Sequence, residues 1–423
     1  MAYFSDDPAD IPDQEQIAPI TGHTSSEGYR ILTFTHYNRS GRKLLFMKKI
    51  LILGAGNAQM DLIQYCQESG MEVHCCSYSE TDPGAFTADH FANINILDCD
   101  RIEQYFLDHK IDVIYSIGSD IAVPVFSKTA AHTQTPSLVS QETARICCDK
   151  TNMRRAMKDK DFTPSFIIGN DLDSILKDAQ AMKIFPAELK PADSQGQRGV
   201  ATVCDERELR ESFEKTMSFS RKGEAVLEEY INGDEVSVNA YLHKGEILFS
   251  FLSDREIWPG YPGGIIHRHH FPSVYEGSEI HRKILHLVQE VVRAVGLTDG
   301  PVYFQIMIQE DTPYLIEVTP RLDGCHLWRL IREATGIDLL DMTMNHLLYK
   351  DPFHRKTYSL RDGGLSDAPI YHLEFYCQAP GERADFSAFL KEDAIYRSMY
   401  YQEGETIKPV NGYMEKCAYR IYR

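Results

Sequence analysis

The feature that most constrains the fold is an unbroken apolar run, KILILG, over residues 49–54. The run lacks the alternation of polar and apolar side chains that marks a half-exposed strand, and a glycine turn and a helical pattern follow it at once. A strand that is apolar on both faces needs cover on both, as in a parallel sheet with helices on either side. The alternation continues with a strand over 72–77, a helix near 100–109 and a strand over 112–117. The sequence therefore predicts a doubly wound α/β domain.

The turn after this strand, Gly54-Ala55-Gly56, matches the first two glycines of a dinucleotide-binding fingerprint. Gln59 stands where the third glycine of that fingerprint belongs. Because that glycine lets the helix pack closely against the strand, its replacement favours a structural turn. NAD binding is the alternative for this turn.

Composition limits the classes of protein that the chain can represent. At 423 residues it has room for two or three domains, and 43% hydrophobic residues suffice for packed cores. Because 62 acidic and 44 basic residues give a net charge of −18, a broad nucleic-acid surface is disfavoured, although a nucleotide needs only a few local cations. No apolar run approaches the roughly 18 residues of a membrane span, and no secretory signal is evident. We therefore expect a cytoplasmic protein with no nucleic-acid or membrane partner.

Ten cysteines are present, and no two of them have C-x-x-C spacing. Such pairs mark cysteine-held zinc sites, and dense cysteine frameworks belong to small secreted domains. We therefore expect reduced thiols and no structural zinc.

The most informative polar pattern is a predicted β-hairpin over residues 303–318. Strand-like runs over 303–309 and 313–318 flank a short polar loop. If the loop has three residues, Gln305 lies opposite Glu317 on one face of the hairpin, whereas a loop of four residues places the two side chains on opposite faces. The register of the hairpin therefore decides whether it carries a site.

The first register brings together ligands for a hard cation. The Glu317 carboxylate and the Gln305 amide oxygen, with the Thr319 hydroxyl two residues on, suit Mg²⁺, which also takes water and phosphate oxygens. Arg321, just beyond the strand, can hold a phosphoryl or carboxylate group with two parallel hydrogen bonds. The alternative is an exposed hairpin with an incidental Gln and Glu.

Two lysines upstream of the hairpin are candidates for phosphate binding. Lys150 lies in a predicted helix over 140–160, where a lone lysine is usually solvated. Lys190 lies near the end of a predicted strand over 185–191 and precedes a glycine-bearing loop over 192–200. Such a loop can turn backbone N–H groups toward phosphate oxygens while the lysine supplies a point charge. The loop lacks the G-x-x-x-x-G-K pattern of a Walker sequence, and a surface hairpin is the alternative.

Two acids accompany a predicted apolar strand over 225–231. Glu228 lies within that strand and Glu235 follows the next turn. Buried acids are rarely left unpaired, so these carboxylates could meet an adenine amino group and ribose hydroxyls. The alternative is a pair of acids at a turn.

Four features of the sequence, taken in order, are Lys150, the loop after Lys190, the acids Glu228 and Glu235, and the hairpin with Gln305, Glu317 and Arg321. In this order and spacing they resemble the ATP-grasp superfamily, most closely its carboxylate–amine ligases and carbamoyl-phosphate-synthase-like members. The resemblance runs from Met47 nearly to the C-terminus, and the segments over 82–85 and 118–124 resemble the α/β domain that precedes the ATP-grasp fold in that family. We expect four parts: an irregular extension over 1–46, a Rossmann-like domain over 47–137, an ATP-grasp domain over 138–350 with a mobile lid near 163–230, and a linker with a small β subdomain over 351–423.

The resemblance also implies roles for individual residues. It implies that the ATP phosphates are bound by Lys150 and Lys190 with the loop residues Ser194, Gly196 and Gly199, that adenine is bound by Glu228, Tyr230 and Ile231, and that the ribose is bound by Glu235. It implies that Mg²⁺, or Mn²⁺ as a substitute, is bound by Gln305, Glu317 and Thr319. Arg321 is implied to hold the acyl-phosphate and the substrate carboxyl group, and with Lys190 it forms the expected catalytic pair.

The implied reaction is that of an ATP-dependent ligase. A small carboxylate is activated as an acyl-phosphate and coupled to an amine, with release of ADP and phosphate, and a homodimer is the default assembly. The family most often has Asn at the position of Thr319. A non-catalytic ATP-binding regulator therefore stays open, as does a carbamoyl-phosphate-type or kinase-like enzyme.

The stretch over 253–273, rich in Gly, Pro and His, is the most individual part of the chain. Related amino-acid ligases often carry Glu and His at the positions of His267 and His270, so these two residues are expected to face the substrate. Gly324 and Cys325 are expected to line the same pocket as Arg321. A metal held by the histidines and ordinary packing are the alternatives.

Overall fold

The computed structural model describes residues 47–194, 196, 198–258, 265–359, 365, 368–410 and 414–423. The predicted extension over 1–46 lies outside the described residues except for the backbone of four two-residue strands, β1 (His23–Thr24), β2 (Arg30–Ile31), β3 (His36–Tyr37) and β4 (Lys43–Leu44).

The first domain is the predicted doubly wound α/β unit. Its parallel sheet has the strand order β7-β6-β5-β8, and residues 50–53 of the first strand are completely buried, as expected for an apolar run covered on both faces. The strands are β5 (Lys49–Leu53), β6 (Glu72–Ser77), β7 (His90–Asn93) and β8 (Val113–Tyr115), and the helices are α1 (Asn57–Glu68), α2 (Pro83–Thr87), α3 (Cys99–Asp108) and α4 (Ala122–Thr133).

The glycine turn after β5 is closed by the side chain that replaces the third glycine. Gly54 has φ +94°, and the Gln59 carboxamide accepts a hydrogen bond from the Gly56 N–H (3.0 Å) and donates to the Ile117 carbonyl oxygen. This side chain occupies the space above the turn, which supports the structural interpretation over dinucleotide binding.

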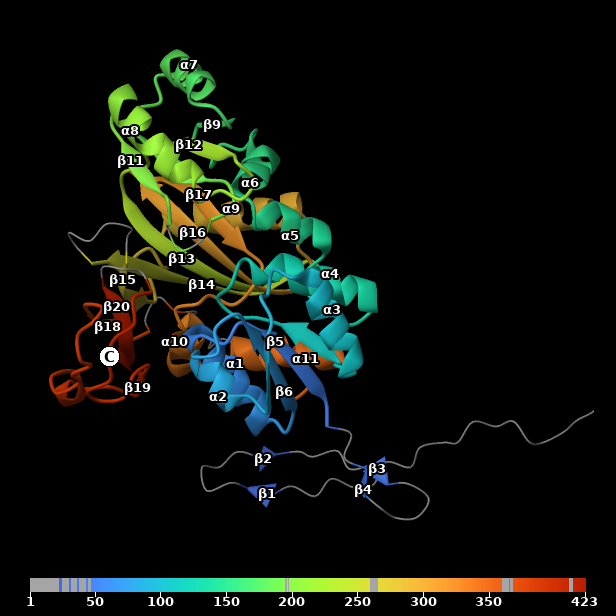
Figure 1. Ribbon diagram of the computed structural model, residues 1–423. Helices are drawn as coiled ribbons and strands as arrows, with labels where there is room; N and C mark the ends of the chain where they lie inside the picture. Colours follow the sequence, from blue (N-terminus) through green and yellow to red (C-terminus); the bar gives the residue numbers. More distant parts are fainter. Residues whose placement is uncertain are drawn as a thin grey trace, which may run out of the picture.

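A second, antiparallel sheet forms a separate small unit with its own core. Its strand order is β11-β10-β12-β9, and it stands at one end of the molecule, with the parallel sheet toward the other (Figure 1). The unit lies within the segment 163–230 that was expected to form a mobile lid, and its mobility stays a prediction. Its elements are β9 (Phe166–Gly169), α7 (Leu172–Met182), β10 (Ala187–Pro191), β11 (Ala201–Val203), α8 (Glu206–Met217) and β12 (Ala225–Glu229).

The largest sheet has eight strands in the order β17-β16-β13-β14-β15-β18-β20-β19. The C-terminal strands extend the central ones because β18 pairs with β15, so the predicted β subdomain is continuous with the central sheet. The strands are β13 (Asp234–His243), β14 (Glu246–Ile257), β15 (Ile266–Phe271), β16 (Gly300–Gln309), β17 (Thr312–Thr319), β18 (Tyr371–Gln378), β19 (Tyr396–Met399) and β20 (Glu415–Tyr422).

Five helices and a short 3-10 turn complete the described structure: α5 (Gln141–Cys147), α6 (Lys150–Met157), α9 (Glu279–Val295), α10 (Leu327–Thr335), α11 (Leu339–Tyr349) and η1 (Phe389–Lys391). The prediction of one helix over 140–160 was wrong. Asp149 caps a new helix by accepting a hydrogen bond from the Asn152 N–H (3.0 Å). The helix is therefore interrupted at Cys148 and Asp149, and Lys150 is the first residue of α6.

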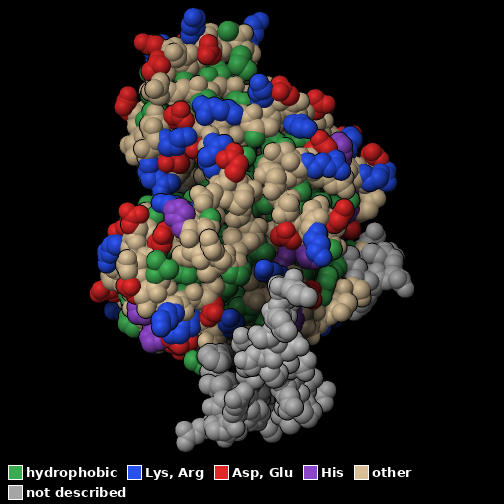
Figure 2. Space-filling view, turned by 90° about the vertical axis from the view of Figure 1, so that its right-hand side faces the viewer, with side chains coloured by type: hydrophobic (Ala, Val, Ile, Leu, Met, Phe, Trp, Pro, Cys, Tyr) green, Lys and Arg blue, Asp and Glu red, His purple; other side chains and the backbone are tan. Residues whose placement is uncertain are grey.

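The described surface mixes charges of both signs. On the face drawn in Figure 2, Lys and Arg side chains are interspersed with Asp and Glu. Within the described residues, no helix is both long enough and apolar enough to cross a bilayer.

Candidate active site

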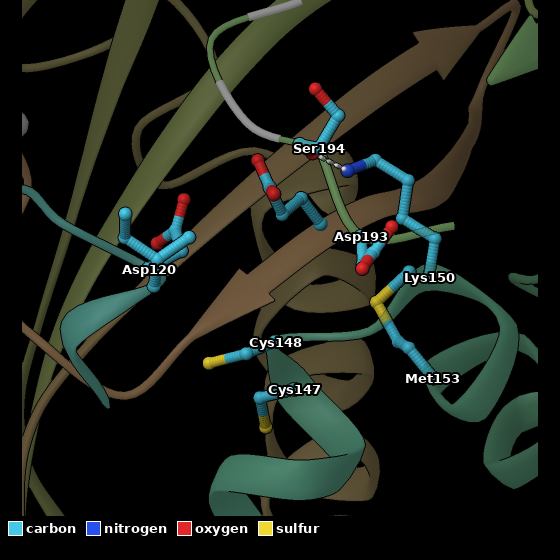
Figure 3. Close-up of a pocket in the computed structure, with 9 residues that line it drawn as sticks. Asp120, Cys147, Cys148, Lys150, Met153, Asp193 and Ser194 are labelled. Atoms are coloured by element: carbon cyan, nitrogen blue, oxygen red, sulfur yellow. Dashed lines mark hydrogen bonds between the residues drawn. The ribbon is translucent and has the colours of Figure 1, made fainter. Parts of the chain in front are cut away.

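A pocket lies where the first domain, the helical segment α5–α6, the loop that follows β10 (the lid loop, with Asp193 and Ser194) and the hairpin β16–β17 meet. Its lining includes Asp120 from the first domain, Lys150 at the start of α6, Ser194 from the lid loop and Glu317 from β17. The Lys150 ammonium donates to the Ser194 carbonyl oxygen (2.7 Å), the dashed contact in Figure 3. The structure therefore brings the predicted phosphate lysine, the predicted phosphate loop and a predicted metal ligand to one place.

Gln305 and Glu317 pair directly across the hairpin, as the first of the two predicted registers requires. The predicted pairing is therefore present, but the loop differs from the prediction: it has two residues rather than three, and Gln309 pairs with Thr312. A β-bulge supplies the missing residue: Leu315 faces Ile306 and Glu317 faces Gln305, so Ile316 is extra.

The bulge is held by a buried arginine that the sequence analysis did not identify. The Arg154 guanidinium donates to the carbonyl oxygens of Leu315 (2.8 Å) and Ile316 (3.2 Å), and it also binds both carboxylate oxygens of Glu228 (2.8 and 2.9 Å). Arg154 lies four residues after Lys150, which places the two basic side chains one helical turn apart. That spacing is the signal that could have revealed it.

Glu228 lies in this network rather than standing alone at the end of its strand. Glu228 is 1% exposed, and its carboxylate also accepts a hydrogen bond from the Lys190 ammonium (2.8 Å). Burial opposes ionisation, but the charges of Arg154 and Lys190 outweigh it and lower the pKa of Glu228 to about 2. Glu228 therefore holds Lys190 in position, and its contact with adenine stays a prediction.

The predicted ribose and metal residues are neighbours. The Gln305 amide N–H donates to Glu235, whose carboxylate is also paired with Arg255, a residue that the sequence analysis did not identify. Because Gln305 uses its N–H group in this way, its carbonyl oxygen is the atom left to face a cation. Thr319 is 1% exposed and its hydroxyl has no hydrogen-bond partner among the described residues. This set of neutral and charged oxygen donors fits a hard cation such as Mg²⁺.

Arg321, the predicted catalytic cation, is tied to the first domain. Its Nε atom donates to the Asp120 carboxylate (2.7 Å), a terminal nitrogen makes a second contact to the same oxygen, and the other binds the Leu322 carbonyl oxygen (3.1 Å). Although burial disfavours the charge, the carboxylates of Asp120 and Glu317 raise the pKa of Arg321.

Gly324 packs against the first domain at a point where the two backbones nearly touch. A Cβ atom at Gly118 would lie 2.7 Å from the Gly324 Cα, and the Gly118 N–H donates to the Leu322 carbonyl oxygen (3.1 Å). The adjacent Cys325 thiol lies 3.5 Å from the Lys416 ammonium. Gly324 therefore lies at a close contact between two domains, and its role in substrate binding stays a prediction.

The two histidines predicted to face the substrate have different surroundings. His270 contacts His372 (2.6 Å) and lines a hollow together with Glu235 and Arg255. His267 packs on the Trp258 ring (4.0 Å between ring centroids), lies 3.3 Å from Glu374 and is not among the residues that line the hollow. The structure therefore brings His270, but not His267, to the predicted ribose residue.

The remaining nucleotide candidates lie along the lid and its hinge. Gly196 and Gly199 have φ +64° and +78°, which suits the tight loop expected there, whereas residues 195 and 197 lie outside the described part. Tyr230 is 38% exposed, its backbone N–H donates to the Pro186 carbonyl oxygen (3.0 Å), and Ile231 is buried.

Part of the sequence matches a known family model, and the chain is similar to a named relative. Residues 184–327 match the family model described as ATP-grasp domain. Carnosine synthase 1 from Mus musculus is 23% identical over 356 residues, which cover 73% of this chain and 40% of that protein, so the chain spans less than half of this relative.

Two solved structures show the same fold. The L-amino acid ligase from Bacillus licheniformis superposes with a TM-score of 0.69 at 17% identity, over 88% of this chain and 92% of that one. The N5-carboxyaminoimidazole synthetase from Staphylococcus aureus, complexed with ADP, also has a TM-score of 0.69 at 17% identity, over 89% and 93%. The predicted resemblance and fold class are confirmed.

Proposed function

Because the chain carries an ATP-grasp domain, we propose that it is an ATP-dependent ligase that activates a small carboxylate as an acyl-phosphate and couples it to an amine. The observation that carries the proposal is the convergence of Lys150, the lid loop at Ser194 and Glu317 on one pocket, together with the bond from Arg321 to Asp120, which also lines it. Relatives named as carnosine synthase and L-amino acid ligase support this reaction type.

Each predicted site residue in and around the pocket has a role that its chemistry suits. Lys150 and Lys190 supply point charges for the phosphates, and Arg321 supplies a planar donor for the reacting carboxylate and phosphoryl group. Gln305, Glu317 and Thr319 would hold Mg²⁺, which when bound neutralises phosphate charge. The carboxylate oxygen attacks the γ-phosphorus as ADP leaves, and the amine then displaces phosphate from the acyl carbon.

The test is phosphate release from Mg·ATP in the presence of pooled small carboxylates and hydroxylamine, which traps acyl-phosphates as hydroxamates. We expect phosphate and hydroxamate to appear together with one pool. Glu317→Ala should lower the rate more than about 100-fold, roughly the loss of a few kcal/mol of charge stabilisation. Glu310→Gln, an exposed acid on the same hairpin, is the matched control and should keep the rate. Nucleotide binding without either product in any pool would contradict the ligase and favour a regulator that uses Thr319 in place of a stronger ligand.

Three finer features belong to the same proposal: the reaction accepts Mn²⁺ as a substitute for Mg²⁺, the chain acts as a homodimer, and it works in the cytoplasm. All ten cysteines are free, which is the state that a reducing compartment maintains. Metal replacement in the phosphate assay and sedimentation of the purified chain test the first two features, and fractionation of cells tests the third.

A further inference from the structure

We propose a second metal site, for zinc, built by His243, Asp299 and His346 and distant from the nucleotide pocket. His243 is the last residue of β13, Asp299 immediately precedes β16, and His346 lies on α11. Three segments far apart in the sequence therefore each contribute one ligand.

The distances among the three ligand atoms are the ones that tetrahedral zinc requires. His243 Nδ1 lies 3.2 Å from His346 Nε2 and 3.3 Å from Asp299 Oδ1, and the third side of the triangle, from His346 Nε2 to Asp299 Oδ1, measures 3.2 Å. Zinc binds imidazole nitrogen and carboxylate oxygen at about 2.0–2.1 Å, so its ligand atoms lie about 3.3 Å apart in a regular tetrahedron. The triangle leaves a fourth position for water.

Outer contacts hold these ligands in place, as in known metal sites. The Tyr241 hydroxyl lies 3.3 Å from His346 Nδ1, the ring nitrogen that faces away from the triangle. The Lys244 backbone N–H donates to Asp299 Oδ1 (3.0 Å). Such partners fix the ring orientation of a ligating histidine and the position of a ligating carboxylate.

A second cluster in the described structure shows what a less suitable site looks like. Glu72, His74 and His90 also lie close together, but the Lys49 ammonium is 3.0 Å from the same Glu72 oxygen that faces both histidines. A cation already occupies that carboxylate, and half of the His90 side chain is exposed (51%). Among the described clusters, the His243 site is therefore the one that suits a metal.

The site lies too far from the pocket to take part in phosphoryl transfer. Asp299 directly precedes Gly300, and Gly300 and Gln305, the partner of Glu317 across the hairpin, are five residues apart on β16, which corresponds to about 17 Å. A metal there would instead clamp α11 onto the β13–β16 pair. The cysteine spacing could not reveal this site, because its ligands are histidine and aspartate.

The experiment uses the full, untagged chain after treatment with a chelator. Zn²⁺ titration should show tight binding at one site, lost at least 100-fold in His243→Ala and in the isosteric Asp299→Asn, and weakened about tenfold in Tyr241→Phe. His90→Ala and Glu317→Ala are matched controls for the other cluster and for the nucleotide-site metal, and both should keep this affinity. Zn²⁺ should also raise the Tm of the wild type but not that of Asp299→Asn.

Co²⁺ provides a readout on the wild type alone, in case a variant fails to fold. Four-coordinate Co²⁺ gives intense visible absorption bands, whereas six-coordinate Co²⁺ gives weak ones. Intense bands that Zn²⁺ abolishes are expected. Weak bands, no binding at micromolar metal, or affinity unchanged in both ligand variants would overturn the proposal.

Discussion

The buried Arg321 forms an ion pair with the partly buried Asp120, 201 positions away, and its Nε atom lies 2.7 Å from the Asp120 carboxylate. The arginine follows the hairpin β16–β17, which carries the predicted metal ligands, and the aspartate belongs to the first domain. The pair therefore orients the predicted catalytic cation from a domain that carries none of the predicted nucleotide ligands.

Asp120→Asn should destabilise the chain by about 3 kcal/mol, because it leaves a buried guanidinium without its counter-charge. Urea denaturation measures this loss, and the rate of phosphate release should fall with it, because Arg321 loses its orientation. Glu142→Gln removes one partner of an exposed pair with Arg145 and is the control, expected to leave the unfolding curve unchanged. Equal curves for the two variants would show that the Arg321–Asp120 pair does not stabilise the fold.

Gly118→Ala should weaken the packing of the first domain against the backbone at Gly324, which follows Arg321. Gly118 has φ +66°, and its added Cβ would lie 2.7 Å from the Gly324 Cα, a backbone atom that cannot turn away. We expect a loss of about 3 kcal/mol, of which about 1 kcal/mol comes from the left-handed backbone alone. Gly70→Ala has a similar φ of +77° with open space around it and measures that backbone part. A loss in Gly118→Ala no larger than in Gly70→Ala would exclude the steric contribution.

The local sequence pattern was enough to predict elements that are buried on every side. The strand over 49–53 is buried on both faces, so its sequence is apolar throughout and its place in a parallel sheet could be predicted. The order of the lysines, acids and hairpin also sufficed to place Lys150, Ser194 and Glu317 together.

The features that sequence reasoning missed depend on partners far along the chain. The bulge at Ile316 is held by Arg154, 162 residues earlier, and nothing in the hairpin itself specifies a two-residue loop plus a bulge. The helix break at Asp149 was missed because an aspartate within a polar helical pattern reads as a surface residue until its capping bond is known.

Arg154→Lys should disrupt the link between the hairpin β16–β17 and strand β12, which carries Glu228. One ammonium cannot reach both oxygens of Glu228 and the two carbonyl oxygens of the bulge, which the planar guanidinium binds at once. We expect a loss of about 3 kcal/mol in thermal or urea unfolding and a lower rate of phosphate release. Arg155→Lys, next in sequence with a half-exposed side chain, should change neither quantity. A stable and fully active Arg154→Lys protein would show that the network is dispensable.

Glu228→Gln should change how stability depends on pH. The folded chain keeps the pKa of Glu228 at about 2, below the usual value of 4.5, because Arg154 and Lys190 outweigh the effect of burial. As the pH falls, the unfolded chain takes up the proton first, so this contribution is complete above pH 4.5 and is lost toward pH 2. Between pH 5 and pH 3 the wild type should lose about 2 kcal/mol that the variant does not. Urea unfolding of both proteins across this range measures the difference, and parallel pH curves would mean that the Glu228 carboxylate is not held as an ion in the folded chain.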